Sequence, residues 1–148
     1  HHNIIWNING TSGLTLWGLP PTSSAYGNSG IRAYNNTVEG EIKFQGSAGS
    51  IAGHDIRNNI TERLVLAGHG REDATITHNL VSNQGFNSFE WPGNIFAPPN
   101  FVAGALANFY LLTDSAAYEA GQVISPFTDG FSGTAPEIGA LEHVGPDA

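Results

Sequence analysis

The stretch Asp55-Ile56-Arg57-Asn58-Asn59-Ile60 contains the pattern that decides the fold, in which an asparagine pair stands between two apolar residues. Similar stretches occur at 3–8, 32–37 and 75–80. Aligned on Asn7, Asn36, Asn59 and Asn79, they place Ile4, Ala33, Ile56 and Ile76 three positions before the asparagine and Ile8, Thr37, Ile60 and Leu80 one position after it. Because the apolar columns keep register with the asparagines, the pattern indicates a structural repeat.

The aligned asparagines are separated by 29, 23 and 20 residues. A repeat of this length that is rich in strand and turn signals and poor in helix patterns is typical of a solenoid coil. Amide side chains stacked one coil apart donate to and accept from one another along the axis. We therefore predict an asparagine ladder at one turn of each coil.

A second strand follows the asparagine in each repeat. It is predicted at 13–17, 41–45 and 63–67, and each segment is followed by a glycine. Alternation along a strand directs Leu14 and Leu16, Ile42 and Phe44, and Leu64 and Leu66 to one face, which we expect to be the interior. Thr15, Lys43 and Val65 then face outward on the same sheet.

Composition narrows the class of protein. The chain of 148 residues has the size of one domain. A formal charge of −8 with five Lys and Arg argues against a nucleic-acid partner. The chain contains no run of 18 apolar residues, so the sequence does not predict a membrane-spanning helix. The lack of Cys excludes disulfides and thiolate metal sites. Glycosylation acceptor patterns occur at Asn9, Asn35 and Asn59.

The pattern changes after Val81. Residues 82–100 contain Gln84-Gly85, Trp91-Pro92-Gly93 and Pro98-Pro99, which predict a loop. Its aromatic residues either line a sugar-binding platform or pack against the last coil. We expect coils over 1–81, and over 82–148 a loop and a closing segment of the same domain.

The tail carries the second strong signal. Residues 111–121 follow the pattern L-x-x-x-S-x-A-x-x-A-G, and residues 129–142 follow D-G-x-x-G-x-x-P-E-I-G-A-x-E. Together they resemble the C-terminal closing segment of secreted right-handed parallel β-helix proteins of the pectate-lyase-like superfamily. This chain departs from that pattern at two positions. Ala116 stands where the family often has proline, and Glu137 stands where aspartate is usual. The resemblance implies an all-β, right-handed parallel β-helix of about four coils with a C-terminal closing segment.

The resemblance also implies a carbohydrate setting. We expect the C-terminal part of a lyase-like, polysaccharide-degrading protein, secreted or at a cell surface, with a polysaccharide as partner. Lyases and glycoside hydrolases share this tail with proteins that have no known reaction, so it leaves enzymatic activity open. The alternative is a non-catalytic structural or adhesive subunit that stacks end to end.

The first residues, His1-His2-Asn3-Ile4-Ile5, already have the pattern of a coil. An uncovered coil end exposes unpaired backbone groups. We therefore expect upstream coils on another chain, or a neighbouring subunit, at the N-terminal end.

Candidate substrate-binding residues lie before the ladder asparagines of two adjacent coils. We predict that Arg32, Tyr34, Asp55 and Arg57 share an outward face. Arginine offers paired donors to sugar carboxylates or hydroxyls, and tyrosine offers a ring. The alternative is a solvated face on which Arg57 pairs with Asp55 or Tyr34.

No cofactor is predicted. Glu39, Glu41 and Glu62 cluster after the ladder and offer a weak candidate site for Ca²⁺. His54 is expected to face inward, and His78 is expected to stack in the column beside the ladder rather than to shuttle protons. Catalytic residues remain unassigned by the sequence.

Overall fold

The computed structural model describes residues 1–6, 12–18, 30–46, 53–67, 74–83 and 92–143. Their strands are β1 (Ile4–Ile5), β2 (Ser12–Gly18), β3 (Arg32–Tyr34), β4 (Thr37–Gly46), β5 (Asp55–Arg57), β6 (Ile60–Ala67), β7 (Thr75–Thr77), β8 (Leu80–Val81), β9 (Ile95–Phe96), β10 (Phe101–Ala103) and β11 (Asn108–Leu111). Within these ranges the only helix is the 3-10 turn η1 (Gly104–Leu106), so the described chain is all-β.

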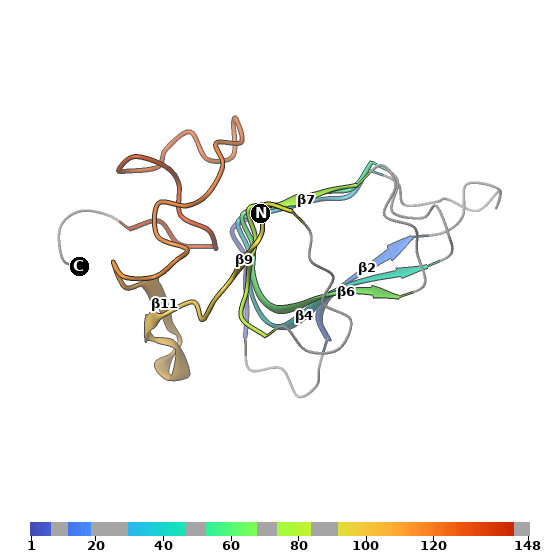
Figure 1. The fold of residues 1–148 in the computed structure, drawn as a ribbon, viewed down its shortest axis with the longest axis horizontal. Coiled ribbons are helices and arrows are strands. Elements are labelled where there is room, and N and C mark those ends of the chain that lie inside the picture. The colour runs from blue at the N-terminus through green and yellow to red at the C-terminus, as the bar shows by residue number, and fades with distance from the viewer. Residues whose placement is uncertain (7–11, 19–29, 47–52, 68–73, 84–91, 144–148) are drawn as a thin grey trace.

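Two parallel sheets build the body of the molecule (Figure 1). One has the order β1-β4-β6-β8-β9, with β2 also pairing with β4, and the other has the order β3-β5-β7. The second strands of the repeat are confirmed, since Leu14 pairs with Ile42 and Ile42 pairs with Leu64 in parallel register. A separate antiparallel pair, β10 and β11, follows them.

The interior lies between the parallel sheets. The predicted inward residues Leu16, Ile42, Phe44 and Leu64 are buried, and Leu14 is partly buried against the same core. The side chain of Leu66 is not among those that the structure describes. From the opposite sheet, Ala33, Ile56 and Ile76 complete the cluster. Apolar side chains of both sheets therefore bury one another, which is the main stabilising term of the fold.

The asparagine ladder is confirmed for Asn36, Asn59 and Asn79. Asn36 Nδ2 donates to Asn59 Oδ1 at 2.8 Å, and Asn59 Nδ2 donates to Asn79 Oδ1 at 2.8 Å. All three residues are buried. Each amide oxygen also accepts the backbone N–H of the preceding asparagine, so the ladder satisfies polar groups that the turn would otherwise bury without partners.

The first rung differs from the prediction. Asn7 lies outside the described residues, and Asn3 occupies the ladder position because Ile4 pairs with Thr37 and Asn3 Nδ2 donates to Asn36 Oδ1 at 3.0 Å. The alignment of the first repeat was therefore wrong by four residues. A further rung, Asn94, was not predicted, and its Oδ1 accepts from Asn79 Nδ2 at 2.8 Å. The following β9 extends the larger parallel sheet.

The residues that directly precede the ladder asparagines in the sequence form a second column. Asn35, Asn58 and His78 have φ values of 49°, 57° and 54°, and His2 has 55°. Asparagine adopts this left-handed region more readily than most residues, which explains the asparagine pairs in the repeat. His78 lies in the column beside the ladder, as predicted, and His2, which stands before Asn3, takes the corresponding place at the first rung. Asn35 and Asn59 are fully buried, so two of the glycosylation acceptor patterns are inaccessible in the folded chain.

The C-terminal segment packs against this turn column (Figure 1). Asn58 Nδ2 donates to the carbonyl of Gln122 at 2.8 Å, and Asn58 Oδ1 accepts the backbone N–H of Gln122 at 2.9 Å. The backbone N–H of Gly139 donates to the carbonyl of Asn58 at 2.8 Å. Gly139 has φ of +115°, and a Cβ there would lie 2.8 Å from Ile60 Cδ1, so this contact requires glycine. In the same segment, Ile138 is buried and Leu141 is half-buried.

Candidate functional site

The four predicted site residues lie together on β3 and β5. Arg32 pairs with Asp55 in the sheet register, and Tyr34 pairs with Arg57. We call Arg32, Tyr34, Asp55 and Arg57 the arginine cluster. Asp55 is at its centre, because Tyr34 Oη donates to its Oδ2 at 2.7 Å and Arg57 Nε donates to its Oδ1 at 2.6 Å. Arg57 also forms a salt bridge with the same carboxylate, and its guanidinium lies 5.5 Å from the centre of the Tyr34 ring.

These contacts shift the ionisation of the arginine cluster. Burial raises the pKa of Asp55, but the hydrogen bonds from Arg57 and Tyr34 outweigh burial and hold it below its ordinary value. The hydrogen bond with Asp55 raises the pKa of Arg57. Burial and the neighbouring carboxylate raise the pKa of Tyr34. The ion pair therefore stays charged through the neutral range.

The C-terminal segment covers much of this cluster. Arg57 Nη1 donates to Gln122 Oε1 at 3.1 Å, and the Phe127 ring lies 5.3 Å from the Tyr34 ring. Tyr34 is only 4% exposed. The Arg57 and Asp55 side chains are each 21% exposed, and Arg32 is exposed. Most of the donors and acceptors of the cluster are used within the chain, and Arg32 is its accessible member.

The acidic residues considered for Ca²⁺ divide into two groups. Glu41 is buried and forms a salt bridge with Arg63, whereas Glu39 and Glu62 are exposed. Over the described part of the chain, no three His, Cys, Asp or Glu side chains lie together as a metal site would require. His54 is buried, as expected, and its Nδ1 lies 3.4 Å from the backbone nitrogen of Ile31.

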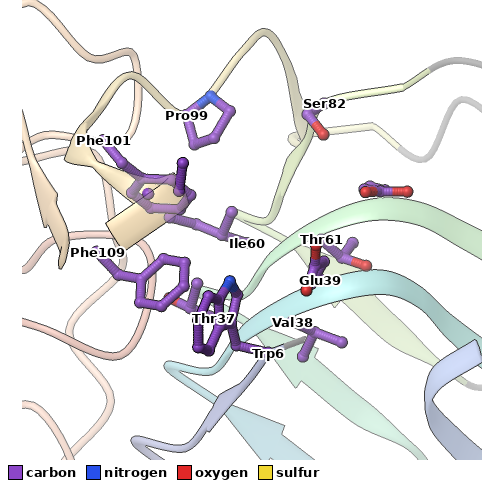
Figure 2. A pocket seen from close by; sticks show the side chains of 13 residues that line it. Trp6, Thr37, Val38, Glu39, Ile60, Thr61, Ser82, Pro99, Phe101 and Phe109 are labelled. Carbon is purple, nitrogen blue, oxygen red and sulfur yellow. The ribbon is translucent and has the colours of Figure 1, made fainter. Parts of the chain in front are cut away.

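A hollow of about 230 Å³ lies beside Trp6, which follows β1. Figure 2 shows Trp6, Phe101 and Phe109 on one side of it, and Glu39 and Thr61 on the other. The described residues that line it are Trp6, Thr37, Val38, Glu39, Ile60, Thr61, Glu62, Ser82, Pro99, Phe101, Gly104, Ala105 and Phe109. We call this feature the Trp6 pocket.

The aromatic wall of the Trp6 pocket comes from distant parts of the chain. The rings of Trp6 and Phe109 meet edge to face at 6.1 Å, and those of Phe101 and Phe109 do so at 5.2 Å. Phe109 is buried, but Trp6 remains 43% exposed. The meeting of Trp6 with the β10–β11 pair was not predictable from the sequence, because these segments are about a hundred residues apart along the chain and no repeat links them.

A second hollow, of about 370 Å³, lies beside β1, β2 and β3. Its lining includes Ile5, Leu14 and Leu16, together with Arg32. Apolar side chains of the core and the exposed Arg32 therefore line the same hollow.

No family model matches the chain, and neither a curated protein nor a solved structure matches it. No helix in the described ranges is long and apolar enough to cross a membrane.

Proposed function

We propose that the chain is a right-handed parallel β-helix module that binds a glycan. The coil interpretation is supported by the two parallel sheets and by the continuous ladder from Asn3 to Asn94, which repeats one turn at every rung. Right-handedness is supported by the strong preference of crossovers between parallel strands for that hand. The resemblance of the tail to closing segments of β-helix proteins supports the same fold.

The observation that carries glycan binding is the Trp6 pocket. It combines a half-exposed indole with the carboxylates of Glu39 and Glu62 and the hydroxyl of Ser82. A sugar ring has an apolar face that packs on an aromatic ring and hydroxyl groups that need acceptors and donors around its edge. A concave site with aromatic walls and a few polar groups matches both needs.

The arginine cluster supports a smaller role. Arg57, Tyr34 and Asp55 bind one another and the C-terminal segment, so their first contribution is to hold that segment. Arg32 is exposed and is available to a polymer that extends along the stacked strands. In this proposal the polysaccharide is an extracellular partner, and the chain is secreted or displayed at a cell surface.

The test is calorimetric titration with oligosaccharides from alginate, pectin, glycosaminoglycan and neutral glycans. Trp6→Ala is expected to weaken the best ligand by about tenfold, which corresponds to about 1.4 kcal/mol. Tyr110→Ala is the matched control, because this exposed aromatic residue lies outside the Trp6 pocket. If no glycan binds, the proposal is wrong. If Arg32→Ala weakens binding and Trp6→Ala does not, the site lies at the arginine cluster.

The hollow beside β1, β2 and β3 favours a second candidate, a structural subunit that stacks end to end. Ile5 and Leu14 offer apolar surface there, next to strands to which another copy can add. Light scattering over a range of concentrations tests this candidate. Assembly that Ile5→Glu abolishes, and that the exposed-site control Val123→Glu preserves, supports it. A monomer at every concentration contradicts it.

A further inference from the structure

The outer face of the β10–β11 pair is apolar and exposed. Phe101 lies opposite Leu111 in the pair, and Leu111 is buried in the core, so these two side chains mark the inner face. Because side chains alternate along a strand, Val102 and Tyr110 share the outer face, and Leu112 follows Tyr110 on it. Val102, Tyr110 and Leu112 are 44%, 38% and 44% exposed. We call these three side chains the hairpin face.

The same region of the chain is free of charge. Residues 91–113 contain no Asp, Glu, Lys, Arg or His, although the chain has a formal charge of −8. Leu106, in the turn η1 between the two strands, is 83% exposed and adds apolar surface at the tip of the pair. Single apolar residues are ordinary on a protein surface, whereas several on one element mark an interaction site. The hairpin face therefore has the composition of an interaction surface.

The pair also has a strand edge that is open to a partner. Among the described strands, β11 pairs with β10 alone. The backbone N–H of Leu112 donates to the carbonyl of Asn100 at 2.9 Å across this pair. Backbone groups point alternately to the two sides of an antiparallel strand, so the N–H of Leu111 is directed to the opposite edge of β11. An exposed edge of this kind is a template for pairing with another strand.

Of the two outer strands, β11 is the better suited to such pairing. The register of the pair shifts between Phe101 and Ala103 on β10, and Pro98 and Pro99 stand just before that strand. Bulges and prolines protect a strand edge from further pairing. β11 contains no proline and no charged residue. The accessible edge of the pair therefore runs along β11.

The open edge determines the kind of partner. A lipid surface satisfies an apolar face, but it leaves the backbone groups of a strand edge without hydrogen bonds. A strand of another polypeptide satisfies both. A second copy of this chain supplies such a strand, because a twofold axis brings the same strand of each copy together in antiparallel orientation. Copies with a charge of −8 repel one another, and the charge-free hairpin is the surface at which this repulsion opposes contact least.

From these observations we infer that two copies of the chain associate through β11, which joins their hairpins into one four-stranded sheet. With the twofold axis at Tyr110, the backbone groups of Leu111 bond with those of Phe109 in the second copy. The two Tyr110 rings then lie side by side on the outer face, where aromatic pairs across strands stabilise a sheet. Val102 and Leu112 of both copies extend this apolar contact.

This association is separate from the two functions proposed above. The Trp6 pocket is lined by Phe101 and Phe109, and Phe101 belongs to the inner face of the pair, so glycan binding does not depend on the hairpin face. End-to-end stacking uses the surface of Ile5 and Leu14, which lies beside β1, β2 and β3. A twofold contact through β11 also closes on itself and gives a dimer, whereas stacking of coil ends gives longer assemblies.

The experiment is sedimentation velocity of the chain and its variants from about 1 μM to 1 mM. We expect a dimer that forms as the concentration rises. Tyr110→Lys is expected to weaken dimerisation by about tenfold or more, because two like charges meet at the axis. Val102→Lys, on the same face but away from the axis, is expected to weaken it less. Val123→Lys is the control, because Val123 is 54% exposed and lies outside the hairpin.

A mixture of two variants tests the twofold contact directly. Tyr110→Lys and Tyr110→Glu are each expected to stay monomeric, and their equimolar mixture is expected to dimerise, because opposite charges then face each other. In the parent chain, exchange of the Leu111 amide hydrogen is expected to slow as the concentration rises. Circular dichroism establishes that each variant is folded.

The outcomes distinguish this inference from its alternatives. A chain that stays monomeric over the whole range overturns it, and so does a dimer that Tyr110→Lys leaves unchanged. If Ile5→Glu abolishes association instead, the contact is end-to-end stacking. Binding of the monomer to phosphatidylcholine vesicles that Tyr110→Lys abolishes overturns the inference in favour of a lipid partner. None of these results alters the glycan titrations of the Trp6→Ala variant, so the two proposals fail independently.

Discussion

The amide oxygen of Asn79 accepts two hydrogen bonds from Asn59, one from Nδ2 at 2.8 Å and one from the backbone N–H at 2.9 Å. The remaining Nδ2 hydrogen of Asn59 is directed to the carbonyl groups of Ala33 and Arg57, each at 2.9 Å. Asn59 Oδ1 in turn accepts from Asn36. A single side chain thus satisfies polar groups on three successive rungs.

We predict that Asn59→Ala lowers the free energy of unfolding by about 1–3 kcal/mol, because the buried amide of Asn36 and the carbonyl of Ala33 lose their partner. Asn59→Asp keeps the acceptor but loses the donors, and we expect it to be at least as destabilising near neutral pH. Urea denaturation measures both. Asn108→Ala, at an exposed position, is the control. A loss below about 0.5 kcal/mol, the range of ordinary surface substitutions, contradicts the prediction.

The second prediction concerns the attachment of the C-terminal segment to Asn58. Asn58→Gly keeps a residue suited to φ of 57° but removes both hydrogen bonds to Gln122. We expect a loss of about 1–3 kcal/mol, with faster amide exchange over residues 121–139 than over β4 and β6. Uniformly faster exchange in both regions would show that the segment unfolds only together with the sheets.

The third prediction concerns acid sensitivity at Asp55. Its pKa is lower in the folded chain than its ordinary value of 3.8, so the unfolded chain takes up this proton first as the pH falls. The stability that the charged Asp55 contributes is present above about pH 4 and is lost below it. Asp55→Asn is expected to lower the melting temperature at pH 6 and to reduce the further loss between pH 4 and pH 3. Melting curves that keep the wild-type pH dependence would contradict this assignment.

The fourth prediction concerns Glu142, whose pKa is shifted in the opposite direction to that of Asp55. Burial and the neighbouring Glu137 raise the pKa of Glu142 from its ordinary 4.5 to about 8. Between these values the folded chain keeps a proton that the unfolded chain has released, so stability falls as the pH rises through this window. Below pH 4.5 both states hold the proton, and above about pH 8 both have lost it.

Glu142→Gln removes this dependence, since the amide stays neutral beside Glu137. We expect the variant to melt at a higher temperature than the parent chain at pH 8, with little difference at pH 4. Asp114→Asn controls for the loss of one exposed carboxylate. A variant that melts lower than the parent chain at pH 8 would show that the charged form of Glu142 is the stabilising one.

The sequence predicted the repeating parts of the fold best, for a physical reason. Asn36, Asn59 and Asn79 share one local environment, so the chemistry of their neighbours recurs and identifies the register. At the first rung, Asn3 and Asn7 both stand before an isoleucine, and the pattern alone does not distinguish them. Asn94 was missed because it follows Asn79 by 15 residues and its preceding residues do not repeat the strand pattern.

The candidate sites were predicted less completely. Shared register brought Arg32, Tyr34, Asp55 and Arg57 together as expected. The covering residues Gln122 and Phe127 come from a segment with no period, so the burial of Tyr34 was not predictable. The Trp6 pocket depends in the same way on contacts between non-repeating segments, which hydrophobic periodicity does not encode.

The ladder also has a consequence for how this chain can be altered. Successive rungs from Asn3 to Asn94 are separated by 33, 23, 20 and 15 residues, yet each makes the same pair of hydrogen bonds to the next. The hydrogen bonds of the ladder therefore form with different numbers of residues between successive asparagines. Foreign peptides can be inserted far from the asparagines while the ladder keeps the strands in register, which makes the molecule a scaffold for loop grafting.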